Sequence, residues 1–204
     1  MATILAAPRG ASEVDLAPED EDRLLALARL CVAAAARGDL ALARDAAAER
    51  LGGRPAVQRR RGAAFVTLLE DGELRGCIGV LDPSKRLTES VAGAAVGAVL
   101  HDWRFRPVTD DELPHIDIHV SVLGPMIELD DPTAFSVGLD GLLVERGPDR
   151  GLLLPEVALE HGFDTEGMLR ATCSKAGLPV DAWRDPGTAV FAFRTRRFGG
   201  PAVP

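Results

Sequence analysis

The first regular pattern in the chain is a series of apolar residues at helical spacing. Pro18 is followed by four acidic residues, which marks a helix start, because proline fits the first turn and acidic side chains stabilise that end. The apolar positions then recur every three or four residues: Leu24, Leu27, Ala28, Cys31 and Ala35. A second, alanine-rich helix is predicted over residues 41–51, and residues 1–16 are predicted to be a flexible tail.

Beyond residue 62 the apolar pattern changes to that of strands and hairpins. Runs at 63–70 and 73–81 flank Asp71-Gly72, a pair typical of a two-residue hairpin turn. Residues 116–122 alternate apolar and polar side chains and predict a half-buried strand. Further strands are predicted at 141–145, 151–154 and 188–198.

Helical segments separate these strands and define the fold class. Residues 88–100 are small and apolar and predict a buried helix, in which Gly93 and Gly97 allow close packing of another element. Thr109 and Glu112 have capping-box spacing. Helices are also predicted at 155–161 and from Asp164 to Ala176. We therefore expect one α+β domain over residues 17–204, with antiparallel sheets flanked by helices.

Composition narrows the class of protein. The chain has 204 residues and a formal net charge of −8, which argues against nucleic-acid binding as the main function. The three cysteines form no C-x-x-C pair, and the first residues do not have the pattern of a signal peptide. No apolar run is long enough to span a membrane. We expect a cytoplasmic protein with reduced thiols.

A scan for catalytic and cofactor motifs is largely negative. The common nucleotide-loop, nucleophile-elbow and zincin patterns are absent. His115 and His119 are four apart, but on a strand they would lie about 13 Å from each other, too far for one metal ion. We therefore expect no metal or cofactor. The basic run Arg59–Arg61 is either an anion contact or a solvated linker, and we favour the linker.

Cys77 is the strongest candidate for a chemically reactive residue. It is expected in a strand between Gly76 and Gly79, and glycines within strands mark bulges or close approach of another backbone or ligand. Arg75 is two residues away on the same expected strand face, and a guanidinium near a thiol lowers its pKa. Cys77 is either a nucleophile or ligand assisted by Arg75, or a small buried residue with Arg75 paired to an acid.

Ordered motifs along nearly the whole chain strongly resemble the AMMECR family, whose bacterial members are called AmmeMemoRadiSam system protein A. The most specific motif is the Leu-Arg-Gly-Cys-Ile-Gly hexamer at 74–79. Others are Asp-x-Arg-Phe-x-Pro at 102–107, Thr-x-Asp-Glu-Leu-Pro at 109–114, Leu-Leu-Pro-Glu-Val-Ala at 153–158 and Cys-x-Lys-Ala-Gly-Leu-Pro at 173–179. Members often have His-Gly where this chain has Asp140-Gly141.

The resemblance implies an α+β fold of two lobes with a cleft, in which the hexamer is the hallmark. It also implies a bacterial protein whose genetic neighbourhood holds a Memo-like protein and a radical S-adenosylmethionine protein. Carried over to this chain, the candidate site is Arg75, Gly76, Cys77 and Gly79, with Cys77 as the candidate catalytic residue. The chain lacks the cysteine triad that holds the cluster of a radical enzyme, so it is not itself that component.

Three functions remain open at this point. The first is an enzyme or enzyme component in which Cys77 or Arg75 contacts a substrate. The second is a non-catalytic adaptor that binds the Memo-like or radical partner. The third and weakest is nucleic-acid binding or modification through Arg59–Arg61 and the arginines at 194, 196 and 197.

Overall fold

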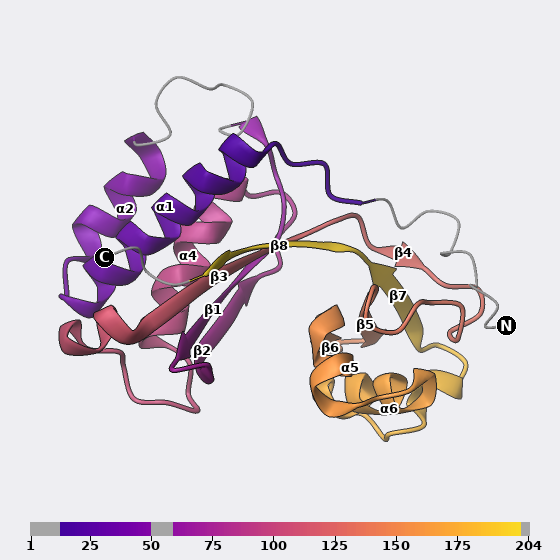
Figure 1. The fold of residues 1–204 in the computed structure, drawn as a ribbon. Helices are drawn as coiled ribbons and strands as arrows, with labels where there is room; N and C mark the ends of the chain where they lie inside the picture. The colour runs from indigo at the N-terminus through magenta and orange to yellow at the C-terminus, as the bar shows by residue number, and fades with distance from the viewer. Residues whose placement is uncertain (1–12, 50–58, 201–204) are drawn as a thin grey trace, which may run out of the picture. The chain divides into compact units, whose positions relative to one another are not determined.

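The computed structural model describes residues 13–49 and 59–200, and these form two compact units (Figure 1). Among the described residues, one unit is made of residues 15–49, 59–122 and 196–200, and the other of residues 13–14 and 123–195. Each unit has its own four-stranded sheet. We refer to them as the helical unit and the hairpin unit.

The helical unit holds a sheet of strand order β2-β1-β3-β8 with helices on one of its faces (Figure 1). Its elements are α1 (Pro18–Ala36), α2 (Leu40–Glu49), β1 (Ala64–Glu70), β2 (Glu73–Val80), α4 (Leu87–Leu100), the 3-10 helix η1 (Asp110–His115), β3 (Ile116–Leu123) and β8 (Thr195–Gly200). The predicted hairpin between β1 and β2 is confirmed, and Asp71 and Gly72 both have positive φ, as a tight hairpin turn requires.

The core of the helical unit lies between α4 and the sheet. α4 packs on β1 and β2, and α1 and α2 pack on α4. On β1 the side chains of Val66 and Leu68 are fully buried, while Thr67 between them is only half-buried. A Cβ at Gly97 would lie 2.8 Å from a methyl of Ile78, so the predicted close packing at this glycine is confirmed.

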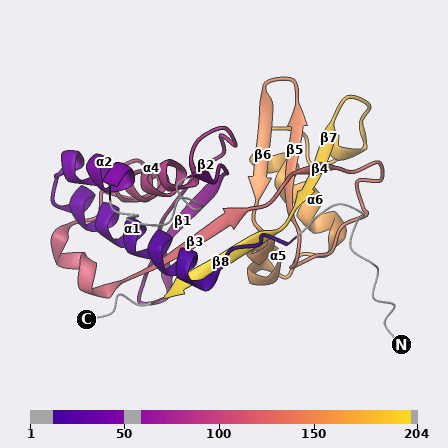
Figure 2. The ribbon, with the colours of Figure 1, turned by 90° about the horizontal axis from the view of Figure 1, so that it is seen from above.

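The hairpin unit holds a second antiparallel sheet of strand order β4-β7-β5-β6 (Figure 2). Its elements are β4 (Ile127–Glu128), β5 (Gly141–Arg146), β6 (Asp149–Leu153), α5 (Pro155–His161), α6 (Thr165–Lys175), the 3-10 helix η2 (Ala182–Arg184) and β7 (Ala189–Phe193). α6 packs on β5 and β6, with Met168 and Leu169 fully buried against Leu142 and Val144. Helices with two antiparallel sheets confirm the α+β class.

The single strand predicted over 188–198 is wrong, because the chain forms two strands there. β7 and β8 belong to different sheets and are separated at Arg194. The Nε of Arg194 lies 2.5 Å from a carboxylate oxygen of Asp140, which is fully buried. Asp140 also accepts a hydrogen bond from the Ser136 amide, so this departure from the family pattern holds a buried ion pair.

The predicted tail and the segment after α2 lie largely outside the described residues. Of the last tail residues, Val14 and Leu16 are buried against the fold. The last two residues of the second predicted helix, 50 and 51, are among the residues that the structure does not describe. Within the described ranges, no helix has both the length and the apolar character to cross a membrane.

Candidate functional site

A β-bulge in the hexamer sets the direction of its side chains. Strand pairing runs Leu69 with Leu74 but Leu68 with Gly76, so Arg75 is an extra residue on β2. A register shift by one residue turns the following side chains to the other face of a sheet. Without the bulge, Cys77 would pair with Val66 and point into the core under α4. The hexamer glycines left open a bulge or the close approach of another backbone, and the structure has a bulge here, which turns Cys77 out of that core.

Cys77 lies in a cross-strand row on the face of the sheet opposite α4. Thr67 on β1 pairs with Cys77 on one side and with His119 of β3 on the other. Directly paired residues point to the same face, and we call this row of three the thiol face. The Cys77 sulfur lies 3.3 Å from the Thr67 hydroxyl, and all three side chains are half-buried. Burial, followed by the nearby charge of Arg197, lowers the pKa of His119, although Asp117 opposes it.

The loop after α4 supplies the charged groups next to Cys77. Asp102 is buried, and one of its carboxylate oxygens accepts a 2.8 Å hydrogen bond from the Cys77 amide. Arg104 donates to both oxygens of Asp102, at 2.9 and 2.7 Å. This pairing, with the amides of Cys77 and Arg104, lowers the pKa of Asp102 to about 2 against the opposing effect of burial. Arg104 has its pKa raised, first by Asp102 and to a smaller degree by the Cys77 thiolate.

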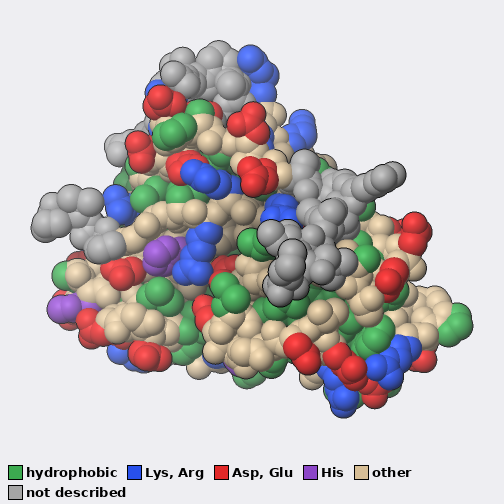
Figure 3. Space-filling view, turned by 45° about the vertical axis from the view of Figure 1, so that its right-hand side comes forward, with side chains coloured by type: hydrophobic (Ala, Val, Ile, Leu, Met, Phe, Trp, Pro, Cys, Tyr) green, Lys and Arg blue, Asp and Glu red, His purple; other side chains and the backbone are tan. Residues whose placement is uncertain are grey.

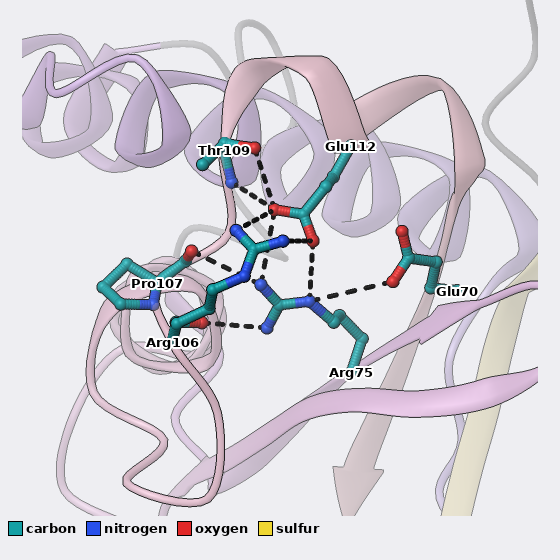
Figure 4. Close-up of polar contacts among 6 residues, drawn as sticks. All are labelled: Glu70, Arg75, Arg106, Pro107, Thr109 and Glu112. Atoms are coloured by element: carbon teal, nitrogen blue, oxygen red, sulfur yellow. Dashed lines mark hydrogen bonds and ion pairs between the residues drawn. The ribbon is translucent and has the colours of Figure 1, made fainter.

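Arg75 points to a different partner from the one that strand alternation suggested. Figure 4 shows its guanidinium reaching from β2 to Glu112 of η1, with Nε 2.9 Å from a carboxylate oxygen. It also donates to the carbonyl oxygens of Arg106 and Pro107, at 2.9 and 3.3 Å. Arg106 and the amide and hydroxyl of Thr109 complete the contacts of Glu112. The structure thus gives Arg75 the acidic partner that the alternative interpretation of Cys77 expected.

The two glycines of the candidate site meet different neighbours. A Cβ at Gly76 would overlap the carbonyl oxygen of Ala98, so its absence lets the β2 backbone lie against α4. A Cβ at Gly79 would overlap the Phe65 ring, which packs over this glycine beside Thr67. Gly76 therefore serves packing, and Gly79 belongs to the face that carries Cys77.

The remaining groups singled out in the sequence are the histidine pair and the basic run. His115 ends η1 and His119 lies within β3, and among the described residues no group of three metal-ligating side chains could hold an ion. Arg60 donates to the Asp15 carbonyl oxygen and Arg61 to that of Ser84. On the face drawn in Figure 3, acidic and basic side chains of the described residues are interspersed, without a broad basic patch.

The lowered pKa of a carboxyl group in this region predicts that the protein loses stability in acid. The pKa of Glu112 falls from its ordinary 4.5 to about 2, mainly because Arg75 and Thr109 bind its carboxylate. A carboxyl with a depressed folded-state pKa stabilises the fold above its unfolded pKa, and the contribution disappears as pH falls through the folded value. The free energy of unfolding is therefore expected to decrease from about pH 4.5 down to about pH 2.

Urea unfolding curves recorded at closely spaced pH values across this range measure the loss directly. In Glu112→Gln the slope of stability against pH is expected to be shallower, since that titration is gone. An unchanged slope in this variant would contradict the assignment of the acid sensitivity to Glu112.

Two charged residues beside Cys77 were not identified as site residues from the sequence. Asp102 and Arg104 stood only as part of a family motif, 25 and 27 residues beyond the thiol. A reading of the hairpin without its bulge pairs Thr67 with Gly76, so the contact between Thr67 and Cys77 was also missed. In the sequence, only the repeated glycines of the hexamer pointed to an irregularity in the pairing of β1 with β2.

Comparisons with known proteins agree with the motifs. A family model, AMMECR1, matches residues 25–198. A protein of Methanothermobacter thermautotrophicus is 49% identical over 150 residues, covering 71% of this chain and 78% of the relative. A protein of Methanocaldococcus jannaschii is 41% identical over 152 residues, covering 71% and 76%. The crystal structure of an uncharacterized protein from Pyrococcus horikoshii has a TM-score of 0.80 at 33% identity, covering 93% of this chain and 96% of that one.

These findings confirm the family resemblance and correct one expectation attached to it. The expectation of a bacterial protein is wrong, because the similar relatives are archaeal proteins. The motifs identified the family, and the bacterial origin was inferred only from the name attached to its bacterial members.

Proposed function

Because this chain belongs to the AMMECR1 family, we propose that it is a component of a system with a Memo-like protein and a radical S-adenosylmethionine protein, in which Cys77 contacts the substrate. The proposed role of Cys77 is supported by the bulge, which turns a half-buried thiol out of the core, and by Arg104, which binds the same Asp102 oxygen as the Cys77 amide. An adjacent guanidinium favours the thiolate, which is the nucleophilic and ligating form of cysteine. Family membership, through the genetic neighbourhood it implies, supports the partnership.

The rest of the thiol face suits a small polar substrate. Thr67 offers a hydroxyl within hydrogen-bond reach of the sulfur. His119 has a lowered pKa, so its imidazole is mostly neutral near pH 7 and is able to accept a proton. Arg104 supplies a positive charge for an anionic group. Gly79 lies on the same side of the sheet as this row. Arg75 and Gly76 lie at the bulge, where they contact η1 and α4.

The test is the rate at which iodoacetamide alkylates Cys77 in the native protein. Replacing Arg104 by Gln is expected to slow the reaction near pH 7 by about tenfold, the effect of one pKa unit on the thiolate fraction. Cys31 and Cys173 are internal controls, since both are buried and burial raises the pKa of each thiol, that of Cys31 to about 11. Peptide mass spectrometry identifies the labelled residue.

Arg106→Gln is the matched control, because it removes a guanidinium of the same loop that binds Glu112. It is expected to leave the alkylation rate within about twofold of the wild type. Equal rates in the wild type and Arg104→Gln, or labelling of Cys77 only after unfolding, would make the thiol structural and favour the adaptor function.

A non-catalytic adaptor that binds the same partners is the second candidate. It is favoured by Trp103, whose surface is 91% exposed in the loop beside Cys77. The nucleic-acid alternative has less support, since Arg194 is paired with Asp140 and Arg196 with Glu21. We also propose a cytoplasmic location, supported by three free cysteines, which are typical of a reducing compartment.

A further inference from the structure

Trp103 is a large aromatic side chain that the fold holds out to solvent. At 91% exposure it contrasts with Leu74 at 40%, the most exposed large apolar residue of the neighbouring strand β2. Large aromatic residues bury most of their surface in cores and interfaces and dominate the energetics of both. An indole exposed to this extent contributes little to the stability of the isolated chain, and tryptophan is enriched at protein interfaces.

The loop that carries Trp103 is fixed before any partner binds. The Asp102 carboxylate accepts bonds from the amide and Nε of Arg104, and the Phe105 amide donates to the Asp102 carbonyl oxygen. The guanidinium groups of Arg75 and Arg104 both contact the Phe105 ring, 5.9 and 5.4 Å from its centroid. Because the backbone of this loop is already ordered, burial of the side chain adds no cost of loop ordering, which favours tight binding.

The charge around Trp103 indicates the chemistry of its partner. Side chains of Arg104 and Arg106 are 38% and 68% exposed, whereas their carboxylate partners Asp102 and Glu112 are 3% and 11% exposed. The loop therefore presents guanidinium groups outward and keeps the negative charges beneath. Tryptophan and arginine are the residues that most often carry the binding energy of protein interfaces.

We propose that Trp103 is the anchor of a docking site for a protein partner that has an apolar pocket bordered by carboxylates. The proposal rests on the partnership above and adds where the partner binds. Trp103 directly follows Asp102, whose carboxylate accepts a hydrogen bond from the Cys77 amide. A partner that binds the indole therefore lies close to the thiol face. The same loop therefore binds the partner and borders Cys77.

The experiment measures the dissociation constant with the Memo-like and radical S-adenosylmethionine proteins of the same organism, by calorimetry. Trp103→Ala is expected to weaken binding at least about thirtyfold, as for a central anchor residue. Leu159→Ala, at a 69% exposed leucine of the hairpin unit, is the control and is expected to change binding less than twofold. Since Trp103 is 91% exposed, Trp103→Ala is expected to have the same unfolding temperature as the wild type.

A second readout follows the indole itself. The chain has two tryptophans, so 5-fluorotryptophan gives two ¹⁹F resonances, and Trp183→Phe assigns them. The Trp103 resonance is expected to shift on adding partner, and added salt or Arg106→Gln is expected to weaken binding.

The remaining outcomes of these experiments distinguish an error in the proposed partnership from an error in the proposed docking site. Wild-type protein that binds neither partner would refute the partnership, whereas equal binding by Trp103→Ala would refute only the docking site. Salt-independent binding would overturn the acidic character of the pocket. A Trp103 shift with decathymidylate would instead assign the loop to single-stranded nucleic acid, and a shift on concentrating the chain alone would assign it to a second copy.

Discussion

Replacement of Glu112 by alanine is expected to lower the free energy of unfolding by about 3–5 kcal/mol. The side chains of Arg75 and Glu112 are only 9% and 11% exposed, and the carboxylate is the acidic partner of that guanidinium at 2.9 Å. Its removal leaves the buried guanidinium with two carbonyl oxygens and only the more distant, partly exposed Glu70 carboxylate, and Thr109 loses the acceptor of its amide. Urea denaturation followed by far-ultraviolet circular dichroism at neutral pH measures the change.

Glu70→Gln is the matched control for this variant. The Glu70 carboxylate also approaches Arg75, but at 3.9 Å and with 37% of its side chain exposed. A partly exposed pair of this kind contributes at most about 1 kcal/mol. If the two variants were destabilised equally, the buried pair with Glu112 would not be the contact that holds the bulge to η1.

Gly76→Ala is expected to destabilise the protein by about 3 kcal/mol, toward the upper end of the usual cost of overpacking. The added methyl would overlap the carbonyl oxygen of Ala98 and lie 3.3 Å from its carbon, and both are backbone atoms of α4. A flexible side chain could move away at little cost, but here a strand must separate from a helix in the core. The same denaturation measurement applies.

Gly93→Ala is the control for this variant, since Gly93 lies on α4, the helix that Gly76 approaches, in a more open place. Its Cβ would meet only a methyl of Val80, at 3.4 Å. Alanine is the better helix former, so this variant is expected to be as stable as the wild type or up to about 1 kcal/mol more stable. A stable Gly76→Ala protein with altered Cys77 alkylation would instead make Gly76 part of the binding surface.

Local patterns were sufficient to predict most helices, the hairpins and the family. The helix from Pro18, the turn at Asp71-Gly72 and the capping box at Thr109 each depend on residues close together in the chain. The pattern over 188–198 also predicted extended structure correctly, but not its division at Arg194. That division depends on a buried ion pair with Asp140, 54 residues earlier in the chain.

The site itself was predicted only in part, for the same physical reason. The hexamer pointed to Cys77, and its glycines pointed to a bulge. Strand alternation predicted that Arg75 and Cys77 point to the same face of the sheet. Arg75 is itself the extra residue of the bulge, so the alternation is interrupted there. Arg104, the guanidinium that the structure places by Cys77, comes from a loop that only the packing of α4 against the sheet brings there.

The sequence by itself therefore determined the helices, most strands, the α+β class, the family and the identity of the candidate thiol, because these depend on neighbouring residues and on ordered motifs. Tertiary structure alone decided which way Cys77 faces, which cation accompanies it, that Arg75 is bound to Glu112, and that Trp103 is left in solvent. Each of these depends on strand register or on contacts between distant segments, and neither is encoded in the spacing of residues along the chain.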